Sequence, residues 1–152
     1  MPLTRLALTA SLVLALTACG GGGLGSVLGP NPINNVQCNP GTQVQLANPL
    51  PGQTGVSTNT SQITIVANGS NNFLYNSYSQ WNVTLVPQYG GGPPIQGGPL
   101  SLVPDPNGPH PFSSDFYYNS NVGSLPSGVT WDVQLSEQFG NCLPVPLNTF
   151  ST

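Results

Sequence analysis

Apolar and polar residues alternate along several short segments between residue 42 and the end of the chain. In the two clearest segments, Trp81–Leu85 and Val129–Leu135, every second side chain is apolar. This period of two is typical of β-strands that bury one face. Weaker alternation predicts further strands at Thr42–Leu46, Gln62–Val66, Leu100–Val103, Phe112–Tyr118 and Leu147–Ser151. We therefore expect an all-β domain of about seven short strands joined by turns rich in Gly and Pro.

The first residues follow a different pattern. Arg5 precedes an almost uninterrupted apolar run from Leu6 to Leu16. Such a run is too short to cross a bilayer as a mature helix and is typical of a cleaved export signal with a helical apolar region.

The run ends at Leu16-Thr17-Ala18-Cys19, which resembles the lipobox of bacterial lipoproteins. The resemblance implies cleavage after residue 18, lipid on Cys19 and anchorage to a membrane of the cell envelope. Because Gly20 rather than Asp follows the cysteine, it also implies the outer membrane in a Gram-negative cell. The alternative is an ordinary secretory signal with a cysteine there by chance.

Residues 19–36 have the composition of a tether. Gly20 to Gly23 form an unbroken run, and further Gly and Pro follow. Such a segment behaves as a flexible coil and cannot bury enough apolar surface to fold alone. The expected organisation is a signal peptide at 1–18, a lipidated tether at 19–36 and one folded domain at 37–152.

Charge narrows the classes of partner. The whole chain has 1 Lys+Arg against 4 Asp+Glu, and the single cation is Arg5 in the signal. Nucleic-acid affinity comes mostly from Lys and Arg on phosphates, so we expect no nucleic-acid partner. The expected partners are the membrane, through lipid on Cys19, and a protein or glycan of the envelope.

Four blocks of the domain resemble the bacterial Ig-like family first described in an S-layer protein. They are Pro49–Ile65, Leu125–Leu135, Gly140-Asn141 and the closing Asn148–Thr152, in the family's order. The stretch from Gly90 to Pro111 looks like a Gly- and Pro-rich insertion. The resemblance implies an Ig-like Greek-key β-sandwich and a role as a spacer or adhesion module.

The three cysteines of the chain have two expected roles. With Cys19 assigned to lipid, Cys38 and Cys142 remain as an even pair in an exported, oxidising setting. In an Ig-like sandwich the first and last strands commonly lie side by side, so a Cys38–Cys142 disulfide is expected. The alternative is two free thiols.

No catalytic pattern stands out, and we expect no enzymatic activity, no cofactor and no metal. His110 is the only histidine and lies between two prolines, which favours a solvated turn. Asp105, Asp115, Asp132 and Glu137 could pair for acid–base work, with Asp132 and Glu137 near one strand end. The segment from Asp105 to Gly108 has a weak likeness to a calcium loop, but a turn in which Asp caps its own backbone is the simpler interpretation.

Two hypotheses of function remain. The first is a lipid-anchored structural, adhesion or protein-interaction module. The second is a glycan-binding or polysaccharide-processing accessory that stacks sugars on surface aromatic residues. Its candidate stacking residues are Tyr75, Tyr78, Tyr89, Tyr117 and Tyr118. An exposed aromatic strip beside carboxylates in a cleft would favour the second hypothesis, whereas we expect these rings, like Trp81 and Trp131, to serve mostly in packing.

Overall fold

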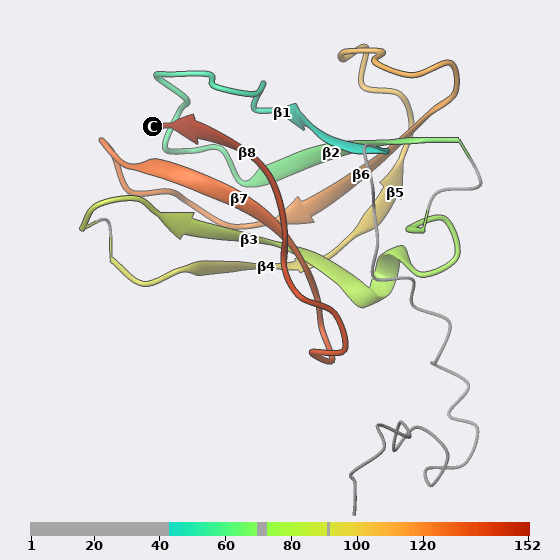
Figure 1. Cartoon of the computed structure of the whole chain (residues 1–152). Coiled ribbons are helices and arrows are strands. Elements are labelled where there is room, and N and C mark those ends of the chain that lie inside the picture. Colours follow the sequence, from blue (N-terminus) through green and yellow to red (C-terminus); the bar gives the residue numbers. More distant parts are fainter. Residues whose placement is uncertain (1–42, 70–72, 91) are drawn as a thin grey trace, which may run out of the picture. The chain divides into compact units, whose positions relative to one another are not determined.

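The computed structural model describes residues 43–69, 73–90 and 92–152, in which eight strands form two antiparallel sheets of four (Figure 1). The strands are β1 Val44–Asn48, β2 Gln62–Asn68, β3 Trp81–Pro87, β4 Ile95–Pro99, β5 Ser101–Val103, β6 Asp115–Asn121, β7 Thr130–Glu137 and β8 Val145–Ser151. A single turn of 3-10 helix, Tyr78–Gln80, precedes β3.

The strand order identifies the type of sandwich. One sheet has the order β1-β2-β6-β5 and the other β4-β3-β7-β8. Immunoglobulin domains of the constant type place strands A, B, E and D on one sheet and C, F and G on the other. The described strands reproduce this order when β4 is counted as an additional edge strand beside β3. The prediction of an Ig-like β-sandwich is therefore confirmed, with eight strands in place of about seven.

Two elements differ from the sequence prediction. Strand β4, with the sequence Ile-Gln-Gly-Gly-Pro, was not predicted because it has no apolar alternation. Strand β6 begins at Asp115 and not at Phe112, because Phe112 belongs to the preceding loop, where it packs on the outside of the sheet. The other six strands lie where the alternation predicts them, within a few residues.

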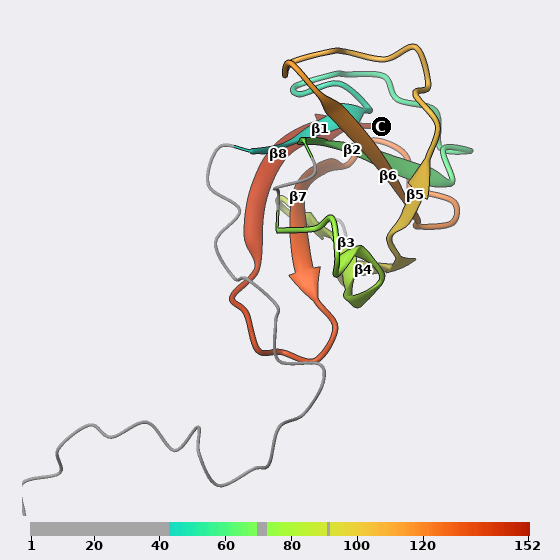
Figure 2. The ribbon, with the colours of Figure 1, turned by 90° about the vertical axis from the view of Figure 1, so that its right-hand side faces the viewer.

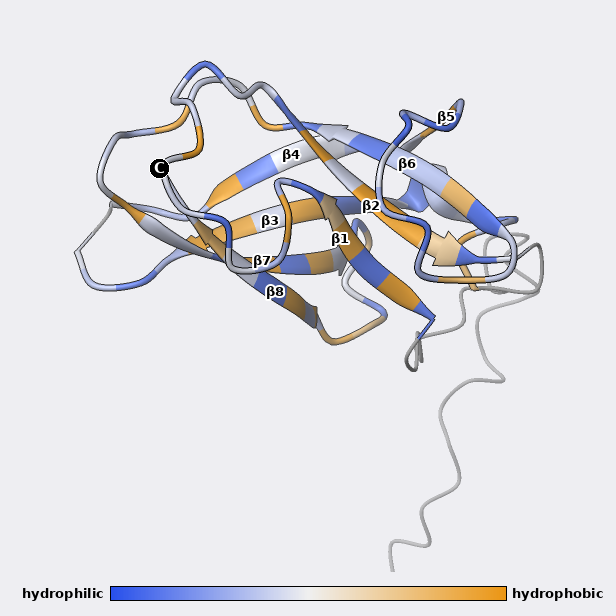
Figure 3. Ribbon diagram, turned by 90° about the horizontal axis from the view of Figure 1, so that it is seen from above, coloured by the Kyte–Doolittle hydropathy of each residue, from blue (hydrophilic) through white to orange (hydrophobic). Residues whose placement is uncertain are grey.

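The core lies between the two sheets. Strand β3 contributes Trp81, Val83 and Leu85, all 0 % exposed, and β7 contributes the equally buried Trp131 and Leu135. Figure 3 shows the alternation of apolar and polar residues along β7 and β8. Both tryptophans are thus core residues, as the period of two predicts, and neither offers a ring to a ligand.

At one point the two sheets approach closely. Ser120 of β6 is 0 % exposed, and its hydroxyl donates to the carbonyl of Gly98 in the opposite sheet at 2.7 Å. The same oxygen accepts the amide of Val83 at 3.3 Å. Beside it, a Cβ on Gly97 would collide with the Ser120 hydroxyl and lie 3.0 Å from the Val83 carbonyl. Gly97 is therefore required for the sheets to come this near.

The outer face of the first sheet is covered in part by the loop between β5 and β6. Ala47, Val66 and Tyr117 point to this outer side and are at most 2 % exposed, and Val103 and Phe112 pack against them. The loop thus creates a second small apolar cluster on a face that an isolated sheet would leave in water. This covering explains why β2 is buried on both faces.

Three of the four sheet edges are short, end on proline or are occupied. Strand β5 has 3 residues and is followed by Pro104, and β4 ends on Pro99. The edge of β8 is bonded by the segment that follows β1: the Gly52 amide donates to the Thr149 carbonyl at 2.7 Å. Further amide bonds run from Val56 to Ser151 and from Ser151 to Gln53. These backbone hydrogen bonds also join the two sheets along their β1 and β8 sides (Figure 2).

The predicted signal helix and Gly-rich tether lie outside the described residues, as do Cys19 and Cys38. Within the described ranges, no helix has the length and apolar character needed to cross a membrane.

Candidate functional site

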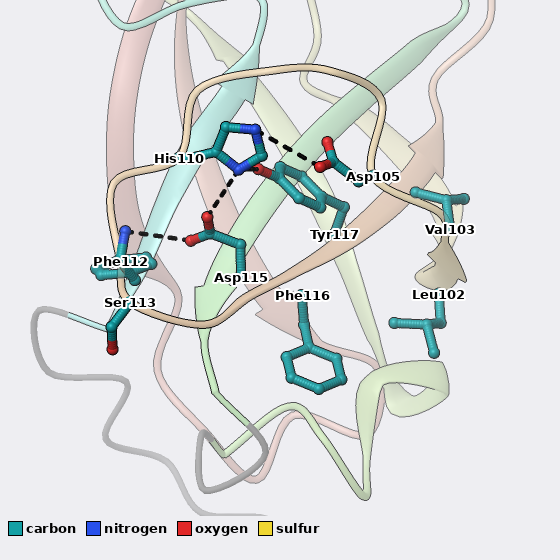
Figure 4. A pocket seen from close by; sticks show the side chains of 9 residues that line it. All are labelled: Leu102, Val103, Asp105, His110, Phe112, Ser113, Asp115, Phe116 and Tyr117. Carbon is teal, nitrogen blue, oxygen red and sulfur yellow. Dashed lines mark hydrogen bonds and ion pairs between the residues drawn. The ribbon is translucent and has the colours of Figure 1, made fainter.

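A cleft of about 550 Å³ lies where the β5–β6 loop folds over β6 (Figure 4). Its walls combine one histidine, two carboxylates and several apolar side chains. They are Leu102, Val103, Asp105, His110, Phe112, Ser113, Asp115, Phe116 and Tyr117. The loop is placed by Phe112, which packs with Tyr117 on the outer face of the sheet.

His110 lies between the two aspartates of the cleft. Its Nδ1 is 3.1 Å from Oδ2 of Asp115, and its Nε2 is 3.5 Å from Oδ2 of Asp105. A carboxylate oxygen can only accept, so Nδ1 must carry the hydrogen that meets Asp115. The imidazole of His110 is 56 % exposed, whereas the side chain of Asp115 is 7 % exposed. The cleft thus has a buried acidic floor and an exposed imidazole at its rim.

Each aspartate also holds the loop backbone. Oδ1 of Asp115 accepts the amide of Phe112 at 3.2 Å. Oδ1 of Asp105 accepts the amide of Asn107 at 2.8 Å, and Asn107 takes a positive φ of 56°. This is the turn in which an aspartate caps its own backbone. Among the described residues, no group of three or more His, Cys, Asp or Glu side chains is arranged to hold a metal ion.

Tyr117 of β6 joins the β5–β6 loop to the sheet. Its hydroxyl donates to the Pro109 carbonyl at 2.8 Å and lies 3.0 Å from Nδ1 of His110. Because the phenol's one hydrogen is used on Pro109, its oxygen can accept only a share of the single Nδ1 hydrogen that also meets Asp115. Burial, followed by the negative charges of Asp115 and Asp105, raises the pKa of Tyr117 above its ordinary value of 10.0. The phenol therefore stays protonated, and the bond to Pro109 stays intact, at neutral pH.

We expect this bond to impose an alkaline limit on stability. A group whose pKa is raised by folding contributes stability that is complete below its unfolded pKa and is lost as the pH rises through its folded pKa. Tyr117→Phe should lower the free energy of unfolding by about 1 kcal/mol at pH 8 and by progressively less above pH 10. Urea denaturation from pH 8 to 11 measures this. Tyr89→Phe, at a fully exposed ring, is the control. An equal deficit for Tyr117→Phe at pH 8 and pH 11 would contradict the assignment.

The other two carboxylates do not form a pair. Asp132 and Glu137 lie five residues apart on β7, about 17 Å in an extended strand. Asp132 accepts the side-chain amide of Gln88 at 2.6 Å. Glu137 is 6 % exposed and accepts the backbone amides of Phe139 and Asn141. Both serve local structure, and their separation is too large for joint acid–base work on one bond.

The five candidate tyrosines do not form one exposed strip. Tyr117 and Tyr118 are 2 % and 0 % exposed, and Tyr78 packs on Tyr118 with ring centroids 5.4 Å apart. Tyr89 is fully exposed in the β3–β4 turn. Tyr75 is 38 % exposed, and its ring meets that of Phe116 edge to face at 5.2 Å. Tyr117 lines the cleft but its ring is buried, and Tyr75 is the exposed candidate beside the cleft, through its contact with the lining residue Phe116.

Cys142 lies in the connection between β7 and β8 and is 8 % exposed. Since Cys38 is outside the described residues, the Cys38–Cys142 disulfide stays a prediction. Digestion without reductant should give one peptide pair that contains both cysteines, and reduction should separate it. Recovery of both peptides as free thiols from exported protein would contradict the bond.

Sequence reasoning missed most of the cleft. Phe112 and Phe116 were assigned to one strand, and Leu102 and Val103 to another, so their meeting around His110 was not foreseen. The available signal was the spacing of Asp105, His110 and Asp115, five residues apart in a segment rich in Pro and Gly.

Comparisons with protein-family models, with curated protein sequences and with solved structures give no match for this chain. They neither support nor contradict the resemblance to the S-layer-type Ig-like family.

Proposed function

We propose that this chain is an exported lipoprotein that displays one Ig-like domain as an interaction module at the cell envelope. Lipid on Cys19 holds it to a membrane, and residues 20–36 give the domain reach. The Ig-like strand order of the two sheets carries the proposal. A sandwich of this kind is self-contained and presents its loops to other molecules, whatever the chemistry of the partner.

The surface chemistry supports a binding role without electrostatic steering. Apart from Arg5 the chain has no Lys or Arg. Of the acidic and basic residue types, the domain therefore carries only four carboxylates and His110. Three of these five groups gather at one cleft, and the outer surface is otherwise dominated by Asn, Gln, Ser and Thr. A partner recognised by such a surface makes neutral hydrogen bonds and apolar contacts.

The anchor is tested by the mass of the mature protein. We expect an amino terminus at Cys19 that carries diacylglyceryl and acyl groups, and recovery of the protein with membranes. Cys19→Ser should release the protein from the membrane fraction, whereas Cys38→Ser should leave it there. An unmodified amino terminus, or cleavage at another residue, would overturn the proposal.

The interaction role is tested by pull-down with the lipidated chain on vesicles. The matched control has residues 104–114 in scrambled order, because this loop builds the cleft. Envelope proteins or glycans retained by the natural chain and lost with the scrambled loop would support the role. Equal retention by the natural chain and the scrambled chain would show that the loop has no part in the interaction.

A second candidate, glycan binding, is favoured by one observation: the cleft combines carboxylates with aromatic walls. Asp105 is half exposed, Phe116 lines the cleft, and Tyr75 lies edge-on against Phe116. Carboxylates accept hydrogen bonds from sugar hydroxyls, and aromatic faces pack on the C–H face of the ring. These two kinds of group in one concave site are what a small neutral ligand needs.

Glycan binding is tested with paired substitutions. Tyr75→Ala should weaken binding of any glycan found on an array by up to about tenfold, because an aromatic contact contributes about 0.5–1.5 kcal/mol. Tyr89→Ala is the matched control, since Tyr89 is exposed but lies in another turn. Asp105→Asn and Asp132→Asn form a second pair. Equal effects within each pair would exclude the cleft as the binding site.

A further inference from the structure

The turn between β7 and β8 stands out from the rest of the domain. Residues 138–144 project beyond the body of the sandwich in both views (Figures 1 and 2). Phe139 is 60 % exposed and Leu143 is 87 % exposed, and the seven residues include no charged side chain. The projecting turn therefore presents two large apolar groups to solvent at a place without charge.

The turn is held firmly at its base. The carboxylate of Glu137 accepts the amides of Phe139 at 3.0 Å and of Asn141 at 2.7 Å. The amide of Gln138 donates to the carbonyl of Gln80 at 2.8 Å. The negative charge of Glu137 is thus buried and bonded to backbone donors. These bonds lower the free-energy cost of placing that carboxylate next to an apolar medium. Phe139 and Leu143 are therefore exposed on a turn that hydrogen bonds hold in place.

The position of Cys142 connects this turn to the anchor. Cys142 lies between Phe139 and Leu143, and its expected partner Cys38 is 19 residues from Cys19. A Gly-rich coil of this length has a typical end-to-end distance of about 24 Å. The disulfide would therefore hold the turn within a short reach of the lipid, at a high local concentration of membrane surface.

We propose that the β7–β8 turn docks on the lipid surface, with Phe139 and Leu143 in the boundary between headgroups and acyl chains. The inference rests on the proposed lipid anchor and on the predicted Cys38–Cys142 disulfide, and it adds an orientation to the anchor. Interfacial binding grows with the apolar area buried and with attraction of cations to anionic lipids. Since this chain has no Lys or Arg after Arg5, the docking uses apolar area and needs no anionic lipid.

A tryptophan reporter in the lipidated full chain tests the docking. Trp81 and Trp131 are 0 % exposed, so their emission does not respond to a surrounding membrane. Leu143→Trp should shift to shorter wavelength on vesicles of phosphatidylcholine, and phosphatidylcholine brominated high in its chains should reduce its emission roughly twofold. Leu50→Trp, at another exposed leucine outside this turn, should show neither change.

The outcomes separate this inference from the anchor. Vesicle flotation and the mass of Cys19 report the anchor, whereas bromine quenching at residue 143 reports the docking. Flotation with no quenching at residue 143 would overturn the docking and leave the anchor standing. Quenching that appears only on anionic vesicles, or that vanishes in high salt, would overturn docking by apolar area.

Discussion

Trp131→Ala should lower the free energy of unfolding by about 3–5 kcal/mol. Trp131 is 0 % exposed on the central strand β7, where it lies opposite Pro87 of β3 and Phe150 of β8. Removing the indole leaves a large cavity in a core that two sheets share, and the strands on either side limit its collapse. Small domains have a total stability of about 5–15 kcal/mol, so the loss is a major part of it. Urea denaturation followed by circular dichroism measures the change.

Trp131→Phe is the matched control. Among the described residues, the Nε1 of Trp131 has no hydrogen-bond partner, so phenylalanine removes a buried donor while it keeps much of the ring volume. The expected loss is below about 2 kcal/mol. If alanine and phenylalanine cost the same, the ring does not fill the core as described.

Gly97→Ala should lower the free energy of unfolding by about 1–3 kcal/mol, although alanine suits a strand better than glycine. The added Cβ would collide with the Ser120 hydroxyl and lie 3.1 Å from Cγ1 of Val122. Gly98→Ala is the natural control, because the nearest atom to its Cβ is the Asn121 carbonyl oxygen at 3.9 Å. We expect Gly98→Ala to change stability by less than about 0.5 kcal/mol.

A double-mutant cycle locates the cause of the Gly97 effect. Ser120→Ala removes the oxygen that the new Cβ would meet, so Gly97→Ala should cost less in that background than in the natural chain. A coupling energy near zero would show that the loss comes from another contact. In that case the close approach of the sheets does not depend on the pair.

The sequence was most informative where burial follows the period of two. Val83, Leu85 and Val133 were placed in the core by alternation alone, and each is at most 1 % exposed. Alternation fails where a strand is buried on both faces or where packing does not need side chains. Asn82 occupies a polar, outward position of the alternation in Trp81–Leu85, yet it is 2 % exposed and donates to the Gly97 carbonyl. Strand β4 forms because it pairs with β3, and the pattern of apolar residues within β4 itself cannot predict this pairing.

The cleft was beyond the sequence for a related reason. His110, Asp105 and Asp115 are close in the chain, so their meeting follows from a compact loop. Its walls depend on how that loop folds back on the sheet, and this is decided by Phe112 and Tyr117 packing over Val66. Such packing is a property of tertiary structure, because both aromatic residues fit an ordinary strand equally well.

The occupied and shortened edges of the two sheets have a consequence for crowding. Proteins confined to a bilayer meet one another far more often than the same number of molecules in solution. An open row of amides and carbonyls would then zip neighbouring copies into stacks. The three-residue β5, the proline that ends β4, and the segment bonded along β8 leave few such rows free. Under the proposed anchor, many copies could share one patch of membrane and each remain a separate domain.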